Sequence, residues 1–144
     1  MSTRAVLTVE EKDGTVFSIY KHGDGYPEGM ALMMVEALQF AWTLPRFEAM
    51  DWSAAFIAAN KPVGGGSVYI TSGADYHSDL DYAYKIGQAK NGQLIVACVS
   101  LIEERLMFYG RLKEFVSQYG NTYAKELWNE LVPSKNPLTV ASAA

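Results

Sequence analysis

The chain has few of the residues on which common catalytic mechanisms depend. Its one cysteine, Cys98, lies in an apolar run, so an intrachain disulfide is impossible and a buried thiol is expected. The lack of disulfides fits a reducing compartment. There are only two histidines and no Gly-x-Ser-x-Gly segment. A hydrolytic mechanism based on serine or cysteine is therefore not expected.

Positive charge is also scarce. Lys and Arg number 12 against 16 Asp and Glu, which gives a net charge of -4. General nucleic-acid binding needs a basic face, so it is not expected here. The apolar, helix-like segment Met30–Trp42 contains Glu36 and Gln39 and is too short to span a bilayer. Because the N-terminus also lacks a signal-peptide layout, we expect no membrane association and a cytoplasmic location.

What the chain does have is enough apolar surface for a core. Hydrophobic residues make up 49% of its 144 residues, and aromatic residues make up 12%. This length and composition predict one domain over residues 1–133. Residues 134–144 lack periodicity and are expected to form a flexible C-terminal tail.

Alternating polar and apolar residues predict two β-hairpins. Their strands and turns are Arg4–Glu10 and Thr15–Lys21 around Asp13-Gly14, and Asp81–Lys90 and Gln93–Ile102 around Asn91-Gly92. The nearly continuous apolar run in 93–102 favours a central strand covered on both faces. Shorter strands are expected at Val68–Thr71 and Leu106–Gly110.

Helical spacing predicts four helices. They are Met30–Trp42, a second from Pro45 that Asn60 and Pro62 stop, Leu112–Tyr119 with Gly120 as a left-handed cap, and a last one from Thr122 to about Leu131. The element order is then ββ-αα-ββββ-αα. Strands joined by tight hairpins favour an α+β domain, with an antiparallel or mixed sheet of five to six strands and helices on one face.

A ten-residue segment between the second strand and the first helix, 20–29, is the densest in functional groups. It supplies most of our candidate binding residues, and Arg46 is added as a basic residue that could converge on the same loop to hold an anion. The candidates are Tyr20, Lys21, His22, Asp24, Tyr26, Glu28 and Arg46. In the alternative interpretation, the glycines of this segment serve turn angles alone.

The two histidines lie in similar triplets, His22-Gly23-Asp24 and His77-Ser78-Asp79. Two imidazoles and two carboxylates from His22, Asp24, His77 and Asp79 could surround a divalent metal, whose bound water would hydrolyse a phosphoester. His22 beside Asp24 could also act as an oriented general base. The simpler interpretation is that both triplets are surface turns. We therefore expect no metal and no cofactor, and keep the metal site as the alternative.

Two further patterns have competing interpretations. The run Gly64-Gly65-Gly66-Ser67 follows a helix and precedes a strand, and Lys61 comes before it, so it does not match a phosphate-binding loop. A flexible connection is favoured instead. Six tyrosines fall on or near the predicted sheet, where they suit an interface or a planar ligand as well as ordinary half-buried positions. These are Tyr20, Tyr26, Tyr69, Tyr76, Tyr82 and Tyr84.

Several segments together resemble a family of small phage and prophage accessory proteins with no established activity. They are Ser2–Ala5, Tyr20–Gly29, Ala54–Lys61, Gly64–Gly66, His77–Tyr82 and Gly110–Phe115, within residues 2–120. The resemblance implies a phage setting, in which such genes often encode inhibitors of a host system or sequestering proteins. It assigns no functional residue.

From these observations we expect a non-enzymatic binding protein in the host-cell cytoplasm. Its partner would be a host protein, such as a defence effector, or a small nucleotide signal. Self-association through the sheet into a homo-oligomer is a further option. The metal-dependent phosphoester hydrolase and a structural component of a phage particle are the alternatives.

Overall fold

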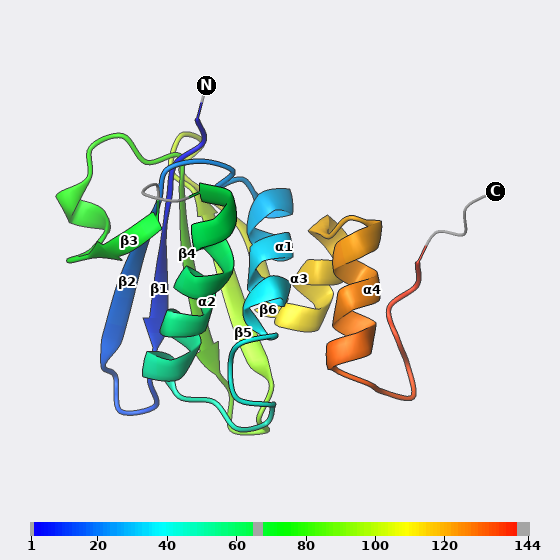
Figure 1. Cartoon of the computed structure of the whole chain (residues 1–144). Helices are drawn as coiled ribbons and strands as arrows, with labels where there is room; N and C mark the ends of the chain where they lie inside the picture. The colour runs from blue at the N-terminus through cyan, green and yellow to red at the C-terminus, as the bar shows by residue number, and fades with distance from the viewer. Residues whose placement is uncertain (1, 65–67, 141–144) are drawn as a thin grey trace.

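Six strands form one mixed sheet in the computed structural model of the chain, which describes residues 2–64 and 68–140 (Figure 1). They are β1 (Ala5–Glu10), β2 (Val16–Lys21), β3 (Val68–Thr71), β4 (Tyr82–Gln88), β5 (Leu94–Ser100) and β6 (Arg105–Arg111). Their order across the sheet is β3-β2-β1-β4-β5-β6. Strands β1 and β4 run parallel, and every other neighbouring pair is antiparallel. The expected α+β fold with a mixed sheet is confirmed.

Both predicted hairpin turns are present, as three-residue loops rather than two-residue turns. The loops are Lys12-Asp13-Gly14 and Lys90-Asn91-Gly92, and their glycines have φ of 92° and 88°. In each loop the Asp or Asn side chain accepts a hydrogen bond from the backbone N–H two residues later. A positive φ at the third position is typical of this hairpin class, which explains why glycine follows Asp or Asn at both sites.

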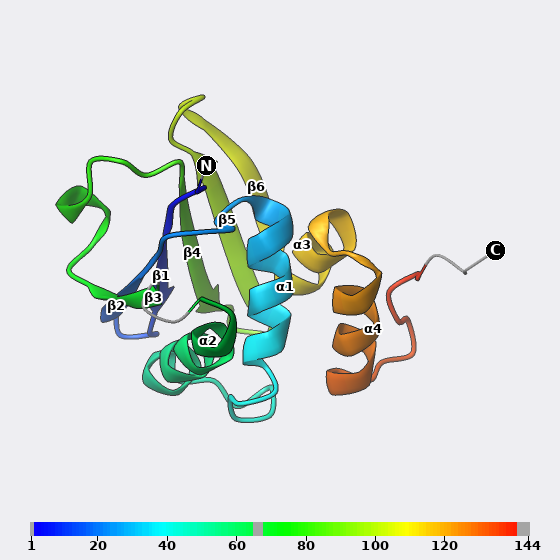
Figure 2. The ribbon, with the colours of Figure 1, turned by 45° about the horizontal axis from the view of Figure 1, so that its top comes forward.

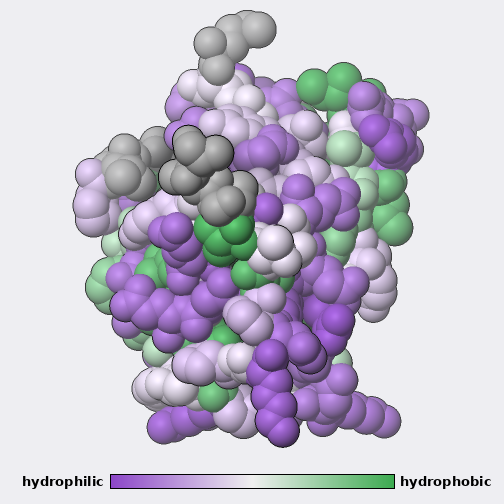
Figure 3. All heavy atoms as spheres, turned by 90° about the vertical axis from the view of Figure 1, so that its right-hand side faces the viewer, coloured by the Kyte–Doolittle hydropathy of each residue, from purple (hydrophilic) through white to green (hydrophobic). Residues whose placement is uncertain are grey.

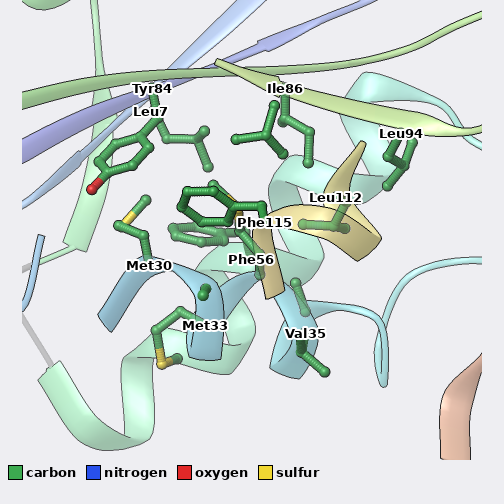
Figure 4. Close-up of a cluster of buried hydrophobic side chains, with 14 of the residues drawn as sticks. Leu7, Met30, Met33, Val35, Phe56, Tyr84, Ile86, Leu94, Leu112 and Phe115 are labelled. Atoms are coloured by element: carbon green, nitrogen blue, oxygen red, sulfur yellow. The ribbon is translucent and has the colours of Figure 1, made fainter. Parts of the chain in front are cut away.

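Four helices in the described residues pack on one face of the sheet (Figure 2). They are α1 (Pro27–Ala37), α2 (Ala49–Gly64), α3 (Leu112–Tyr119) and α4 (Thr122–Leu131). The core lies between the two layers. In Figure 4, Leu7 and Ile86 of the sheet face Met30, Phe56 and Phe115 of the helices, and all five are at most 1% exposed.

The first two helices differ from their predicted bounds. Helix α1 begins at Pro27 and ends at Ala37. It ends there because the N–H groups of the next three residues bond to carbonyls three residues back, which is the tighter pattern of a 3-10 turn. Helix α2 runs through Asn60 and Pro62 to Gly64, so the predicted stop is wrong. Pro62 lies in the last turn, where the loss of one helical hydrogen bond is less disruptive than it is in a helix interior.

Three local predictions need correction. Strand β5 alternates between buried and half-buried residues, because helices cover only one of its faces. Gly120 is extended, with φ -70° and ψ 143°, and is needed because a Cβ there would lie 2.5 Å from the Val116 carbonyl oxygen. Asn121, rather than Thr122, caps α4, because its side chain accepts the Ala124 N–H at 2.8 Å.

After α4, the chain returns to that helix at Leu138. Leu138 is 9% exposed and exchanges two hydrogen bonds with the Asn129 side chain. The rest of the predicted tail, 141–144, and residues 65–67 of the glycine-rich connection lie outside the described residues. The surface on the α4 side is mostly hydrophilic, with hydrophobic side chains in separate patches (Figure 3).

Candidate functional site

The segment 20–29 forms the link between β2 and α1, and its glycines serve close packing. Gly25 donates its N–H to the Thr3 carbonyl, and its own carbonyl accepts a 2.6 Å bond from the buried Tyr84 hydroxyl. A Cβ on Gly25 would lie 2.8 Å from the Ala5 Cβ, and one on Gly29 would lie 2.2 Å from the Asp24 carbonyl oxygen. Much of this unusual composition is therefore explained by the fold.

Lys21 is buried beneath this link, on the face of the sheet that the helices cover. It is only 5% exposed, and its Nζ donates to the Asn60 Oδ1 at 2.7 Å. Asn60 is fully buried, and its amide nitrogen donates to the Phe56 carbonyl, which turns its oxygen toward the lysine. Burial lowers the pKa of Lys21. The amine is thus placed to hold α2 against β2 rather than to meet a ligand from solvent.

The remaining predicted binding residues do not gather into one site. Asp24, Tyr26 and Glu28 are exposed, and the Tyr26 hydroxyl donates to the Asp24 carboxylate at 3.3 Å. The negative charge of Asp24 raises the pKa of Tyr26. Arg46 lies beyond the other end of α1, which is about 16 Å long, with its guanidinium 3.6 Å from the Trp42 ring centre. It does not join the loop.

Four of the predicted residues do lie close together: Tyr20, His22, His77 and Asp79. His77 and Asp79 belong to the connection 72–81, which joins β3 to β4 past the ends of β2 and β1 (Figure 1). The His77 ring stacks on Tyr20 with centroids 4.3 Å apart and an angle of 16°. The Tyr20 hydroxyl lies 3.0 Å from Nδ1 of His22. Arg4 completes the cluster, because its Nε lies 3.2 Å from the Asp79 carboxylate and 3.4 Å from the same His22 nitrogen.

This cluster attaches the connection to β2 and to the residue that precedes β1. No group of three or more His, Cys, Asp or Glu side chains in residues 2–64 and 68–140 is placed to hold a metal ion. His22 faces Tyr20 and Arg4, and Asp24 bonds to Tyr26, so neither the four-ligand set nor the His22–Asp24 pair is assembled. Nε2 of His77 is bonded to the Thr71 hydroxyl at 2.7 Å. His22, His77 and Asp79 thus have contacts that attach the connection.

A different site lies on the uncovered face of the sheet, which we call the open face. A hollow of about 670 Å³ is found there, at the end of the sheet where the two hairpin loops lie. Small residues Gly87 and Ala97 leave room in its floor, since neither carries a large side chain. The basic and aromatic residues that line it are Lys12, Lys85, Lys90 and Tyr109.

The charges of the hollow are unevenly paired. Lys85 forms a 2.6 Å ion pair with Glu10, and Glu11 accepts the Ala49 N–H at the start of α2. Lys12 and Lys90 are exposed and form no ion pair with any residue in the part of the chain that the structure describes. Since β1 and β4 are parallel neighbours, these two unpaired lysines follow the same end of the sheet. Two adjacent positive charges favour an anion.

None of the seven candidate binding residues lines this hollow, although the sequence also offered Lys85, which does line it, as a basic residue that could help to hold an anion. Lys12 and Lys90 could have been noticed, because the chain repeats Lys-Asx-Gly at its two hairpin turns. Their proximity, however, depends on the parallel pairing of β1 with β4, which a sequence of hairpins does not reveal. Tyr109 lies in the predicted strand Leu106–Gly110, but its place beside Ala97 depends on the pairing of β6 with β5.

Comparison with known proteins found no matching family model, no similar curated protein and no similar solved structure. Among the described residues, no helix has both the length and the apolar character that crossing a membrane requires. The functional argument therefore depends on the geometry of the site.

Proposed function

We propose that this chain is a non-enzymatic binding protein that retains a small anionic molecule in the hollow of its open face. One observation carries the proposal: Lys12 and Lys90 both line the hollow on the uncovered face, and neither has a carboxylate partner in the described residues. Folding alone gives no reason to bring two like charges together, because they repel each other. An anionic ligand gives such a reason, because its negative charge offsets that repulsion.

The chemistry of the hollow supports binding rather than turnover. No histidine, cysteine or serine is among the described residues that line it. Both histidines are engaged in the 72–81 connection. Cys98 is buried, which raises the pKa of its thiol to about 11 and keeps it protonated at neutral pH. The reactive side chains thus have positions that the fold explains, away from the hollow.

The size of the hollow supports a small molecule as the ligand. A volume of about 670 Å³ falls within the range of ordinary small-molecule sites. The net charge of -4 makes nucleic acid a poor partner. The resemblance to phage accessory proteins supports a role in the host cytoplasm, where the protein would act by sequestering a signal that a host defence system uses.

Native mass spectrometry of the purified protein tests this proposal. We expect the wild type to carry a bound small anion, and a Lys12→Gln/Lys90→Gln variant to lose it. Lys125→Gln, which removes one positive charge on α4, should keep it. An adduct that survives in the double variant, or a wild type that carries none and binds neither ATP nor inorganic triphosphate, would overturn the proposal. Stoichiometric metal that disappears in His22→Ala would favour the hydrolase instead.

A further inference from the structure

The two lysines occupy equivalent positions in two matching loops. Lys12 and Lys90 are each the first residue of a Lys-Asx-Gly hairpin loop. In each loop the Asx side chain bonds to the backbone two residues on, so both lysines are presented from similar, well-defined turns. Neighbouring strands are about 4.8 Å apart, and lysine side chains are long, so the two amines can reach one phosphate chain.

The carboxylates closest to these lysines along the chain already have partners. Glu10 is paired with Lys85, and Glu11 bonds to the Ala49 N–H. Asp13 accepts the Thr15 N–H, an interaction that lowers the pKa of its carboxyl group. Asp13 still carries its charge beside Lys12, but it does not line the hollow. Negative charge inside the hollow thus comes from Glu10 and Glu11 alone, against three lysines.

Across the hollow from these loops, Tyr109 offers an aromatic face. It lies on β6 in register with Ala97, which in turn is in register with Lys85. Tyr109 is 71% exposed, and its ring makes no aromatic contact with the described residues. The small side chain of Ala97 leaves room beside the ring. Tyrosine rings that are exposed next to a basic groove are typical stacking platforms for nucleobases.

The distance between these two features limits the ligand. Across the strands, β6 is three spacings from β1, which is about 14 Å. The two lysines also lie beyond the ends of β1 and β4, whereas Tyr109 is in register with Lys85 within β4. An isolated phosphate group would occupy only the lysine end of the hollow. A molecule that meets both ends needs an aromatic ring and an extended anionic part.

We infer that the ligand of the hollow is a nucleotide with more than one phosphate, whose base stacks on Tyr109 and whose phosphates lie between Lys12 and Lys90. This inference rests on the proposed function and makes it specific. Ring and charge are recognised by different elements, β6 and the two hairpin loops. Their contributions can therefore be separated by substitution.

Isothermal titration calorimetry with ATP, a linear di-adenylate, adenosine and inorganic triphosphate tests the inference. For the wild type we expect ATP or the di-adenylate to bind roughly ten-fold more tightly than inorganic triphosphate, because triphosphate has no base to stack on Tyr109. Adenosine should bind most weakly. Tyr109→Ala should lower the affinity for the nucleotides to that for triphosphate and leave the affinity for triphosphate unchanged. Tyr109→Phe, which keeps the ring, should bind like the wild type.

The lysine variants separate the inference from the function on which it rests. Lys12→Gln/Lys90→Gln should weaken nucleotide and triphosphate alike by at least about ten-fold, since charged hydrogen bonds are lost. Lys125→Gln should change neither the affinity for nucleotide nor that for triphosphate. If triphosphate binds as tightly as the nucleotides and Tyr109→Ala has no effect, the nucleotide inference is wrong and anion binding stands. If no probe binds, or binding ignores both lysines, both ideas fail.

Discussion

At the scale of single residues, two glycines of the β2–α1 link should respond differently to substitution by alanine. A Cβ on Gly25 would lie 2.8 Å from both the Ala5 Cβ and the Thr3 carbonyl oxygen, whereas one on Gly23 would meet nothing within 4 Å. We expect Gly25→Ala to lower the free energy of unfolding by about 1–3 kcal/mol, since β1 must shift. Gly23→Ala should leave it nearly unchanged. Urea denaturation of both variants measures this, and equal effects would contradict the packing role of Gly25.

Lys21 gives a pH-dependent prediction at the same scale. Burial lowers its pKa below the ordinary value of 10.5, so between the lowered pKa and 10.5 the unfolded chain binds more protons than the folded one. Its contribution to stability is therefore fully present above 10.5 and is lost as the pH falls through the folded pKa. Lys21→Met lacks this dependence.

The free energy of unfolding of the wild type should thus rise relative to that of Lys21→Met as the pH increases toward 10.5. The expected size is about 1.4 kcal/mol for each unit by which folding lowers the pKa. Guanidinium denaturation of both proteins at neutral and alkaline pH checks it. Tyr20 and Tyr84, whose pKa values burial raises, affect both proteins alike and cancel in the difference. A constant difference would show that the amine is not desolvated.

At the scale of elements, the 72–81 connection depends on His77. Its ring stacks on Tyr20 and bonds to Thr71, and both contacts disappear in His77→Ala. Aromatic pairs contribute about 0.5–1.5 kcal/mol, so we expect hydrogen exchange in 72–81 to become roughly 2- to 10-fold faster. Exchange in β4 and β5 should stay the same. Ser78→Ala, at the exposed neighbouring residue, serves as the control, and an unchanged rate in His77→Ala would refute loop attachment.

Sequence periodicity predicted the elements well because local rules govern them. The Asx-Gly turns and alternating strands specify both hairpins, and α3 has its predicted bounds because an amphipathic segment is followed directly by Gly120. Helix α2 was harder to predict, because a proline in its last turn removes only one hydrogen bond. The uncovered face of β5 was also missed, since an apolar run does not reveal on which side helices pack.

The candidate site could not be predicted in the same way, because it depends on contacts between distant elements. Segment 20–29 stood out by composition, yet Gly25, Gly29 and Lys21 are explained by packing. The hollow is made by ordinary residues that only the β1–β4 pairing and the β4-β5-β6 register bring together. Composition marks unusual segments, whereas a binding surface in a sheet is defined by which strands are neighbours.

At the scale of the whole molecule, the two faces of the sheet have different roles. All four helices in the described residues lie on one face (Figure 2). The core on that face buries Leu7, Ile86 and Val96. On the other face, the 72–81 connection occupies one end and the hollow the other. A substitution in the floor of the hollow should therefore change the proposed ligand site and leave the core intact.

Ala97→Phe uses this separation between binding and stability. Ala97 is half-buried in the floor of the hollow, in register with Lys85 and Tyr109, so a phenyl ring there occupies the space that a ligand needs. We expect nucleotide affinity measured by calorimetry to fall by at least ten-fold. The free energy of unfolding should change by no more than about 0.5 kcal/mol, as for other substitutions outside the core. Ala58→Phe, at an exposed position of α2, is the matched control and should alter neither quantity. Unchanged binding in Ala97→Phe would show that the ligand does not bind on the open face. Loss of both binding and stability would show that this face is needed for folding.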